Sequence, residues 1–148
     1  MKKNFNTYLV ALILMSLFLG CTSSPKKETN FYDLEVEKFS SSVKLLLTDL
    51  EFLKKEILKV NATKPSVQRI LIEADKLWMK KELKQASSTL ERGLRIAKDE
   101  SALYLRLAHL RLEQGLIKES SAFAERGLLN KNASSWELLL LKIYSAQK

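Results

Sequence analysis

Glu91-Arg92-Gly93-Leu94 recurs further along the chain as Glu125-Arg126-Gly127-Leu128. Other identical residues stand at the same offset, in the pairs Leu71 and Leu105, Ala74 and Ala108, Lys84 and Lys118, and Ser87 and Ser121. A fixed period of this kind indicates a repeat architecture, in which each short unit buries its apolar face against the next. The sequence therefore predicts stacked units over residues 67–147.

Composition indicates that these units are helical. The chain of 148 residues contains only four Gly and two Pro, and it lacks the long β-branched runs that are typical of strands. Small residues recur where two helices would approach closely, and they are Ala74, Ala86, Gly93, Ala108, Ser120 and Gly127. Ser134 and Glu137 form the pattern of a capping box. They predict a last helix, from Trp136 to about Ala146, that covers the end of the stack.

This pattern resembles the tetratricopeptide repeat, a pair of antiparallel helices that recurs with the same period as the matches above. Gly115 stands at the turn of the second unit, where the family has a glycine, and Lys81 stands at the matching turn of the first unit. We therefore expect an all-α fold of tetratricopeptide-like helical hairpin repeats, with a long N-terminal helix and a C-terminal capping helix.

Residues 34–60 form the predicted N-terminal helix. Apolar residues recur there at spacings of three and four, in the series Val36, Phe39, Val43, Leu46, Leu50, Leu53, Ile57 and Val60. Such a heptad pattern is typical of a coiled coil. Additional leucines widen the apolar surface, however, as in a helix that packs on its own domain. Both interpretations stay open: packing on the repeats, or homo-oligomerisation through Val36–Val60.

The chain begins with the features of a secretory signal. Lys2 and Lys3 precede an apolar run that ends at Gly20-Cys21 and is shorter than the roughly 20 residues needed to cross a bilayer. Residues 1–20 are therefore predicted to be a signal peptide. The stretch Leu17-Phe18-Leu19-Gly20-Cys21 resembles a bacterial lipobox. The resemblance implies a lipoprotein with diacylglycerol, carrying fatty acids such as palmitate, on the thiol of Cys21. Residues 21–33 would then be a lipidated tether.

The lipobox resemblance also implies a location. Thr22 rather than Asp follows the cysteine, and in that family's sorting rule this favours the outer membrane, with the domain facing the periplasm. Nucleic acid is not expected as a partner of an exported protein. The formal net charge of +8 includes Lys2 and Lys3, which would leave with the signal. The remaining positive charge fits solvated helix faces, or attraction to anionic lipid headgroups and cell-wall polymer.

No catalytic or metal-binding set is recognisable in the sequence. His109 is the only histidine, Cys21 is the only cysteine, and both stand alone. The serines of the repeats have no histidine at a readable spacing, and there is no glycine-rich phosphate loop. We therefore expect no enzymatic activity, no cofactor and no metal.

A binding groove is expected instead, because the first helix of each stacked pair lines a concave face. By the repeat register, the groove positions are Leu71, Asp75, Trp78, Met79, Leu105, His109, Leu112 and Glu113. Trp78 and Met79 are the most suggestive, because aromatic residues and methionine are enriched at binding surfaces. The alternative is that the helix of residues 34–60 covers these side chains and fills the groove.

A closer resemblance concerns the function. The stretches Ala86–Tyr104 and Leu107–Gly115 resemble the small outer-membrane lipoprotein activators of class A penicillin-binding proteins. The resemblance implies a protein-binding activator of peptidoglycan synthesis whose partner is a synthase. One alternative is an oligomeric envelope scaffold that coordinates wall synthesis through an N-terminal coiled coil. Another is an accessory of outer-membrane assembly or secretion.

Overall fold

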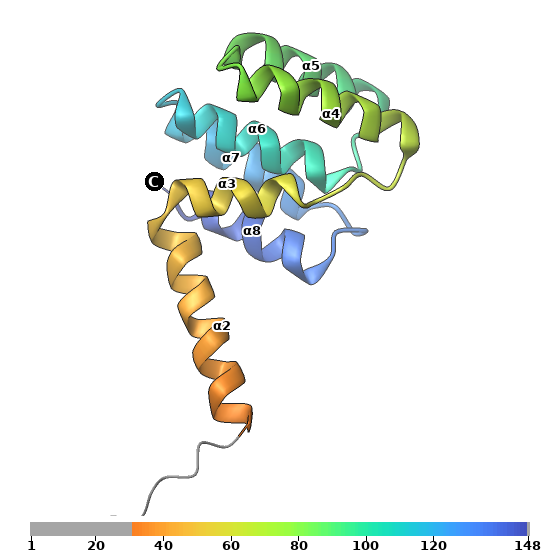
Figure 1. Ribbon diagram of the computed structural model, residues 1–148. Helices are drawn as coiled ribbons and strands as arrows, with labels where there is room; N and C mark the ends of the chain where they lie inside the picture. Colours follow the sequence, from red (N-terminus) through yellow and green to blue (C-terminus); the bar gives the residue numbers. More distant parts are fainter. Residues whose placement is uncertain (1–30, 148) are drawn as a thin grey trace, which may run out of the picture. The chain divides into compact units, whose positions relative to one another are not determined.

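The structure is a computed structural model that describes residues 31–147 of the chain. Over these residues it contains helices and no strand (Figure 1). The helices are α2 (Phe31–Thr48), α3 (Leu50–Leu58), α4 (Pro65–Met79), α5 (Leu83–Ile96), α6 (Ser101–Glu113), α7 (Ile117–Leu128) and α8 (Ser135–Ser145). The expected all-α class is confirmed. The signal peptide, Cys21 and most of the predicted tether lie outside the described residues.

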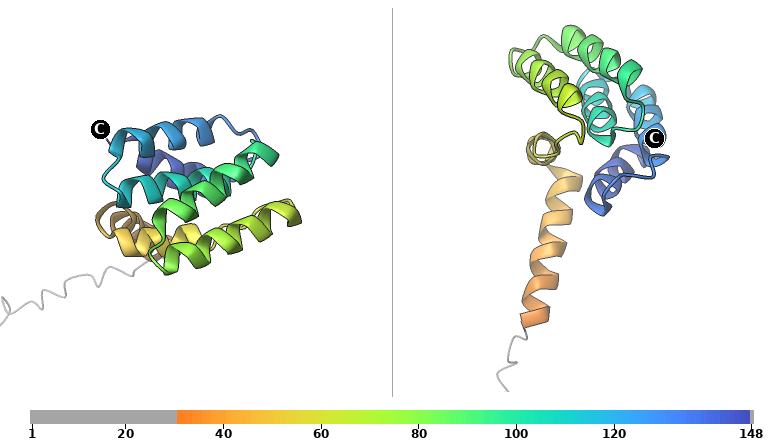
Figure 2. Two further views of the ribbon diagram at one scale, coloured as in Figure 1. Left: turned by 90° about the horizontal axis from the view of Figure 1, so that it is seen from above. Right: turned by 90° about the vertical axis from the view of Figure 1, so that its right-hand side faces the viewer.

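The chain from Glu37 onward forms one compact unit. Its helices pack in sequence order: α4 against α5, α5 against α6, α6 against α7, and α7 against α8. The right-hand view of Figure 2 shows α4 to α8 along an arc, with α3 on the inner side of that arc, where it packs against α6.

The turns that join α4 to α5 and α6 to α7 have the same geometry. Lys81 and Gly115, which stand one repeat apart in the sequence, both have a positive φ, of 63° and 76°. The amide of Lys81 donates to Trp78 O at 2.9 Å, and the amide of Gly115 donates to Leu112 O at the same distance. A left-handed residue directly after a helix is the usual way to end it, so the second helix of each pair starts in the same direction.

Two glycines mark the close contacts between successive helices. A Cβ at Gly93 would lie 3.3 Å from Ile70 Cγ2 and 2.9 Å from a leucine methyl on α6. A Cβ at Gly127 would lie 2.9 Å from Tyr104 Cβ and 2.8 Å from Leu141 Cδ2. Ile70 and Tyr104 are themselves separated by the same repeat offset as the two glycines, so each glycine meets the corresponding position of the preceding helix.

The last helix begins as the sequence predicts. The Ser134 side chain accepts from the Glu137 amide, and the Glu137 carboxylate accepts from the Ser134 amide at 2.8 Å, which completes the capping box. One face of α8 is buried against α6 and α7, and it carries Leu140, Leu141, Ile143 and Tyr144.

The expectation of one continuous helix over residues 34–60 is wrong. α2 ends at Thr48, and Asp49 adopts an extended conformation, with φ −122° and ψ 102°. Its carboxylate accepts from the amides of Glu51 and Phe52 at 2.9 and 3.0 Å. Aspartate side chains compete with the helical backbone for these donors and are among the best N-caps. The heptad series therefore continues through a helix break, and α3 is a separate helix.

The heptad residues differ in burial. Leu46, Leu53 and Ile57 are buried in the unit, whereas Phe39 is 61% exposed and Leu50 is 52% exposed. Packing on the domain is therefore the observed arrangement for α3. A heptad seam running from Val36 to Val60 is not available for self-association in this conformation.

Candidate functional site

The predicted groove residues gather on one face of α4 and α6, but they do not line an open groove. Trp78 and His109 are each 1% exposed, and Leu71 and Leu105 are fully buried. Asp75, Leu112 and Glu113 are partly buried. Met79, by contrast, is 67% exposed. We call the seven remaining residues the inner face: Leu71, Asp75, Trp78, Leu105, His109, Leu112 and Glu113.

The groove is closed because α3 lies in it. Leu53 and Ile57 of α3 are fully buried, and Lys54 between them is only 9% exposed. These positions share one face of the helix, since residues three and four apart lie above one another. The adjacent Lys55 is exposed. The alternative in which the N-terminal segment fills the groove is therefore the observed one, and the expectation of an open groove is wrong.

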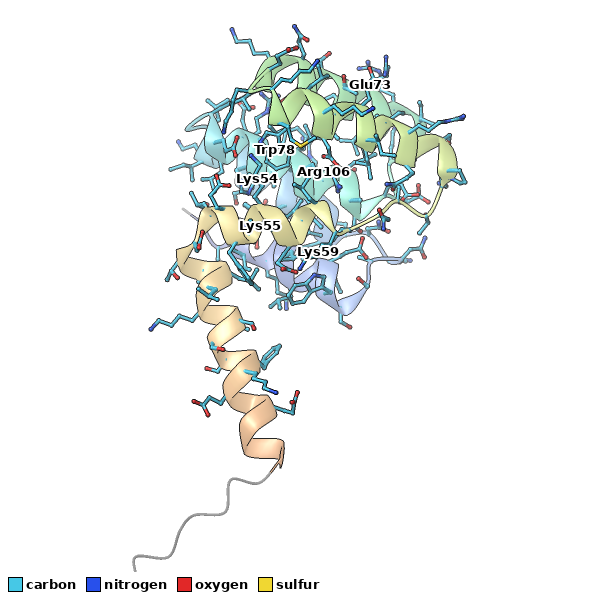
Figure 3. The ribbon with its side chains drawn as sticks, viewed as in Figure 1. Lys54, Lys55, Lys59, Glu73, Trp78 and Arg106 are labelled. Atoms are coloured by element: carbon cyan, nitrogen blue, oxygen red, sulfur yellow. The ribbon has the colours of Figure 1, made fainter. Side chains whose placement is uncertain are left out.

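Lys54 joins α3 to the inner face through a charged cluster. Its Nζ lies 3.1 Å from Glu113 Oε1 and 4.3 Å from the centroid of the Trp78 ring. Trp78 Nε1 donates to the other carboxylate oxygen, Glu113 Oε2, at 2.8 Å. Figure 3 shows Lys54 beside Trp78, between α3 and α4. A lysine over an aromatic face beside a carboxylate gains both cation–π and ion-pair energy.

Glu113 keeps its negative charge in this environment. Burial alone would raise its pKa, but the hydrogen bonds from Trp78 and Lys54 and the positive charge of Lys54 lower the pKa below its usual value. The carboxylate therefore supplies the counter-charge that a largely buried lysine requires.

His109 extends the cluster into the core. Its Nε2 lies 3.3 Å from Glu113 Oε1, and its Nδ1 lies 2.6 Å from the Tyr144 hydroxyl. Burial lowers the pKa of His109 to about 4, against the opposing charge of Glu113. Burial also raises the pKa of Tyr144. A neutral ring that donates from Nε2 to Glu113 accepts at Nδ1 from Tyr144, so both ring nitrogens are engaged inside the protein.

Arg106 holds the other end of α3. It is 1% exposed and forms a two-pronged pair with Asp75, with Nε–Oδ1 at 2.7 Å and Nη2–Oδ2 at 3.0 Å. Arg106 Nη1 also donates to Val60 O at 3.0 Å, and Nη2 donates to Leu58 O at 3.4 Å. The last carbonyls of a helix have no partner within that helix, and here the guanidinium supplies one.

Sequence reasoning found Asp75, Trp78, His109 and Glu113, and the structure brings all four to one face. It missed Lys54 and Arg106, which link that face to α3. Arg106 gave a signal, because it interrupts the apolar run from Ala102 to Ala108, and a charge in such a run is buried only with a partner. Lys54 gave no signal that pointed to the inner face, since lysines are frequent throughout the chain.

This arrangement holds an amphipathic helix, α3, on the inner face through apolar side chains and one ion pair. Among residues 31–147, no group of three or more His, Cys, Asp or Glu side chains could hold a metal ion. The polar side chains of the inner face pair with one another, with Lys54 of α3, or with Arg106 and Tyr144. No helix in this part of the chain is long and apolar enough to cross a membrane. No protein-family model, curated protein or solved structure matches the chain.

Proposed function

We propose that the chain is a protein-interaction module without enzymatic activity, built from tetratricopeptide-like hairpins and held at the outer membrane by a lipid on Cys21. Its inner face binds a helical segment of a periplasmic partner. The proposal rests on the position of α3. This amphipathic helix already occupies the inner face, where Lys54 contacts Glu113 and Trp78.

The recurring geometry supports the assignment of the repeats. The left-handed turns at Lys81 and Gly115 and the close contacts of Gly93 and Gly127 recur at one common offset in the sequence. Stacked helix pairs with such an offset form extended inner surfaces that recognise peptides and helices of other proteins. A binding role therefore follows from the repeat more directly than any chemical role does.

The resemblance over Ala86–Tyr104 and Leu107–Gly115 suggests which partner to test first. We propose a periplasmic segment of a class A penicillin-binding protein, whose peptidoglycan synthase activity the module would raise. A lipid at Cys21 would keep the module in the compartment where that synthase works.

The test is in-cell crosslinking followed by purification of the Cys21-anchored chain from envelopes. We expect a class A synthase in the crosslinked product, and we expect the purified chain to stimulate that synthase on lipid-linked substrate. Cys21→Ser serves as the control for anchoring. It should leave an unprocessed precursor without diacylglycerol, and its normal maturation would refute the lipid anchor. Absence of any class A synthase from the product would refute the partner.

The exposed apolar side chains of α2 favour a second candidate, the oligomeric scaffold. Phe39 is 61% exposed and Leu47 is 64% exposed, and they stand two helical turns apart on α2. Pairing of two α2 helices would cover them. Analytical ultracentrifugation of the full chain decides between the candidates: a dimer or trimer that Phe39→Ser converts to monomer supports the scaffold, and a monomeric parent excludes it.

A further inference from the structure

We propose that α3 is a displaceable ligand of the inner face, and that the partner replaces it with a helix that carries a lysine in the pattern Leu-Lys-x-x-Ile of residues 53–57. This inference rests on the proposed binding function and names the kind of segment that the inner face would take.

The first argument is the way in which α3 binds. Its contacts with the inner face come from one short helical stripe, in which Leu53 and Ile57 supply apolar anchors and Lys54 supplies the charge. This is the mode in which a groove recognises an amphipathic helix, with anchors one turn apart. An external helix with the same stripe presents the same groups to the same face.

The second argument is that the face selects for a cation. Glu113 is charged and is held by the Trp78 Nε1–H at Oε2, while Trp78 presents its ring face to the cation at Lys54. A helix that replaced Lys54 with an apolar residue would bury the Glu113 carboxylate without a counter-charge, which is strongly unfavourable. The replacement must therefore bring its own lysine or arginine.

The third argument concerns the length of the replacement. Arg106 donates to the carbonyls of Leu58 and Val60, which are backbone groups at the end of α3. Any helix that ends there can supply such carbonyls, whatever its sequence. The inner face thus sets two requirements for the replacement helix. It needs a lysine that reaches Glu113, and it must end at Arg106, one to two helical turns after that lysine.

The fourth argument is that α3 can leave without disturbing the remaining helices. It has nine residues, and helices of fewer than about 12 residues are marginal alone in water. The chain directly after it is anchored separately, because the Glu100 carboxylate accepts from the amides of Thr63 and Lys64, each at 3.1 Å. The contacts among α4, α5, α6, α7 and α8 do not pass through α3. Release of α3 would therefore bend the chain between Lys59 and Ala62 and leave the stack in place.

The experiment uses a fluorescent peptide with the sequence of residues 49–61 as the probe. Fluorescence anisotropy measures its binding to the full chain in mild detergent, for the parent and for Lys54→Gln. The substitution weakens the internal competitor and leaves Trp78 and Glu113 intact. The apparent dissociation constant falls as the open fraction rises, so the peptide should bind Lys54→Gln at least about tenfold more tightly than the parent.

A matched pair of peptides tests the role of the lysine. The peptide with Lys54→Gln should lose at least about tenfold in affinity, whereas the peptide with Lys55→Gln should keep its affinity, because Lys55 is exposed in the structure. Equal binding of the parent and Lys54→Gln chains overturns the proposal, and so does an equal loss for the two peptides.

Hydrogen exchange of the parent chain keeps the proposal testable if Lys54→Gln does not fold. The amides of α3 should exchange through a local opening at least about tenfold faster than those of α6, since displaceable segments belong to the low-stability part of a structure. Exchange of α3 and α6 at one common rate overturns the proposal. A chain that takes up the peptide but captures no synthase refutes only the partner named above. A chain that captures the synthase but never takes up the peptide refutes only the displacement of α3.

Discussion

Lys81 and Gly115 occupy the same left-handed position in two turns that lie one repeat apart, with φ of 63° and 76°. Glycine adopts this conformation without strain, whereas a lysine there brings its Cβ close to a carbonyl oxygen. The first turn therefore carries a cost that the second does not.

Replacement of Lys81 by glycine should relieve this cost. We expect Lys81→Gly to raise the free energy of unfolding by about 0.5–1 kcal/mol, with the gain at the left-handed site partly offset by the larger entropy of an unfolded glycine. Lys80→Gly is the matched control, because Lys80 has φ −78° and gains nothing from glycine. Thermal melts of both variants measure the difference. A Lys81→Gly variant that melts below the parent would contradict the shared turn geometry.

The close contacts of Gly93 and Gly127 should not tolerate a side chain. A Cβ at either position would come within 3.0 Å of a neighbouring side-chain atom, and overpacking of a core costs about 1–3 kcal/mol. We expect both Gly93→Leu and Gly127→Leu to lower the thermal midpoint. The Gly127 variant should suffer more, since Tyr104 Cβ lies next to the backbone and cannot rotate away. Parent-like melting of both variants would show that the helix contacts are assigned wrongly.

The buried His109 should make stability depend on pH. Its pKa falls from 6.5 to about 4 on folding, so below pH 6.5 the unfolded chain binds a proton that the folded chain does not. The free energy of unfolding is therefore unaffected by the titration of His109 above pH 6.5. It decreases as the pH falls from 6.5 towards 4, by about 3 kcal/mol in total. Chemical denaturation at several pH values measures it. His109→Gln should flatten the curve over this interval, and an unchanged slope in that variant would refute the assignment.

Lys54 and Glu113 should be energetically coupled. We expect Lys54→Gln to cost about 2 kcal/mol, below the roughly 3–5 kcal/mol of a fully buried pair, because the Glu113 side chain keeps 19% exposure. A double-mutant cycle with Glu113→Gln should give a coupling energy of about 1–2 kcal/mol. Lys55→Gln, one residue away and exposed, should show no coupling to Glu113→Gln. Equal coupling energies of Lys54→Gln and Lys55→Gln with Glu113→Gln would mean that α3 does not pack on the inner face as described.

The helical class and the last capping box could be predicted from the sequence, because both depend on local patterns. Scarce glycine and proline indicate helices, and Ser134 and Glu137 are close neighbours in the chain. The break at Asp49 could not be predicted in the same way. The heptad series passes through it without a gap, and only the local competition of the aspartate carboxylate for backbone amides ends α2.

The sequence could not show whether the groove is open or filled. The repeat register placed Trp78, His109 and Glu113 on one face, and in the structure these three side chains contact one another. Whether that face is open depends on where residues 49–60 pack, and this is decided by contacts between segments far apart in the chain. Lys54 and Glu113 are 59 residues apart, and no periodicity connects them.

The central claim is that the inner face binds a partner through the groups that hold α3. The most direct measurement is the affinity of the purified full chain for a class A penicillin-binding protein from the same cell. It is compared between Lys54→Gln, Lys54→Gln with Glu113→Gln, and Lys54→Gln with Glu73→Gln, because Lys54→Gln already removes the internal ion pair and the second substitution then acts on the partner alone. Glu73 is exposed on α4, where it pairs with Arg92, and it serves as the matched control. The account predicts that adding Glu113→Gln weakens binding at least about tenfold while adding Glu73→Gln leaves it unchanged. No binding by the Lys54→Gln chain, or the same affinity with and without Glu113→Gln, would contradict it.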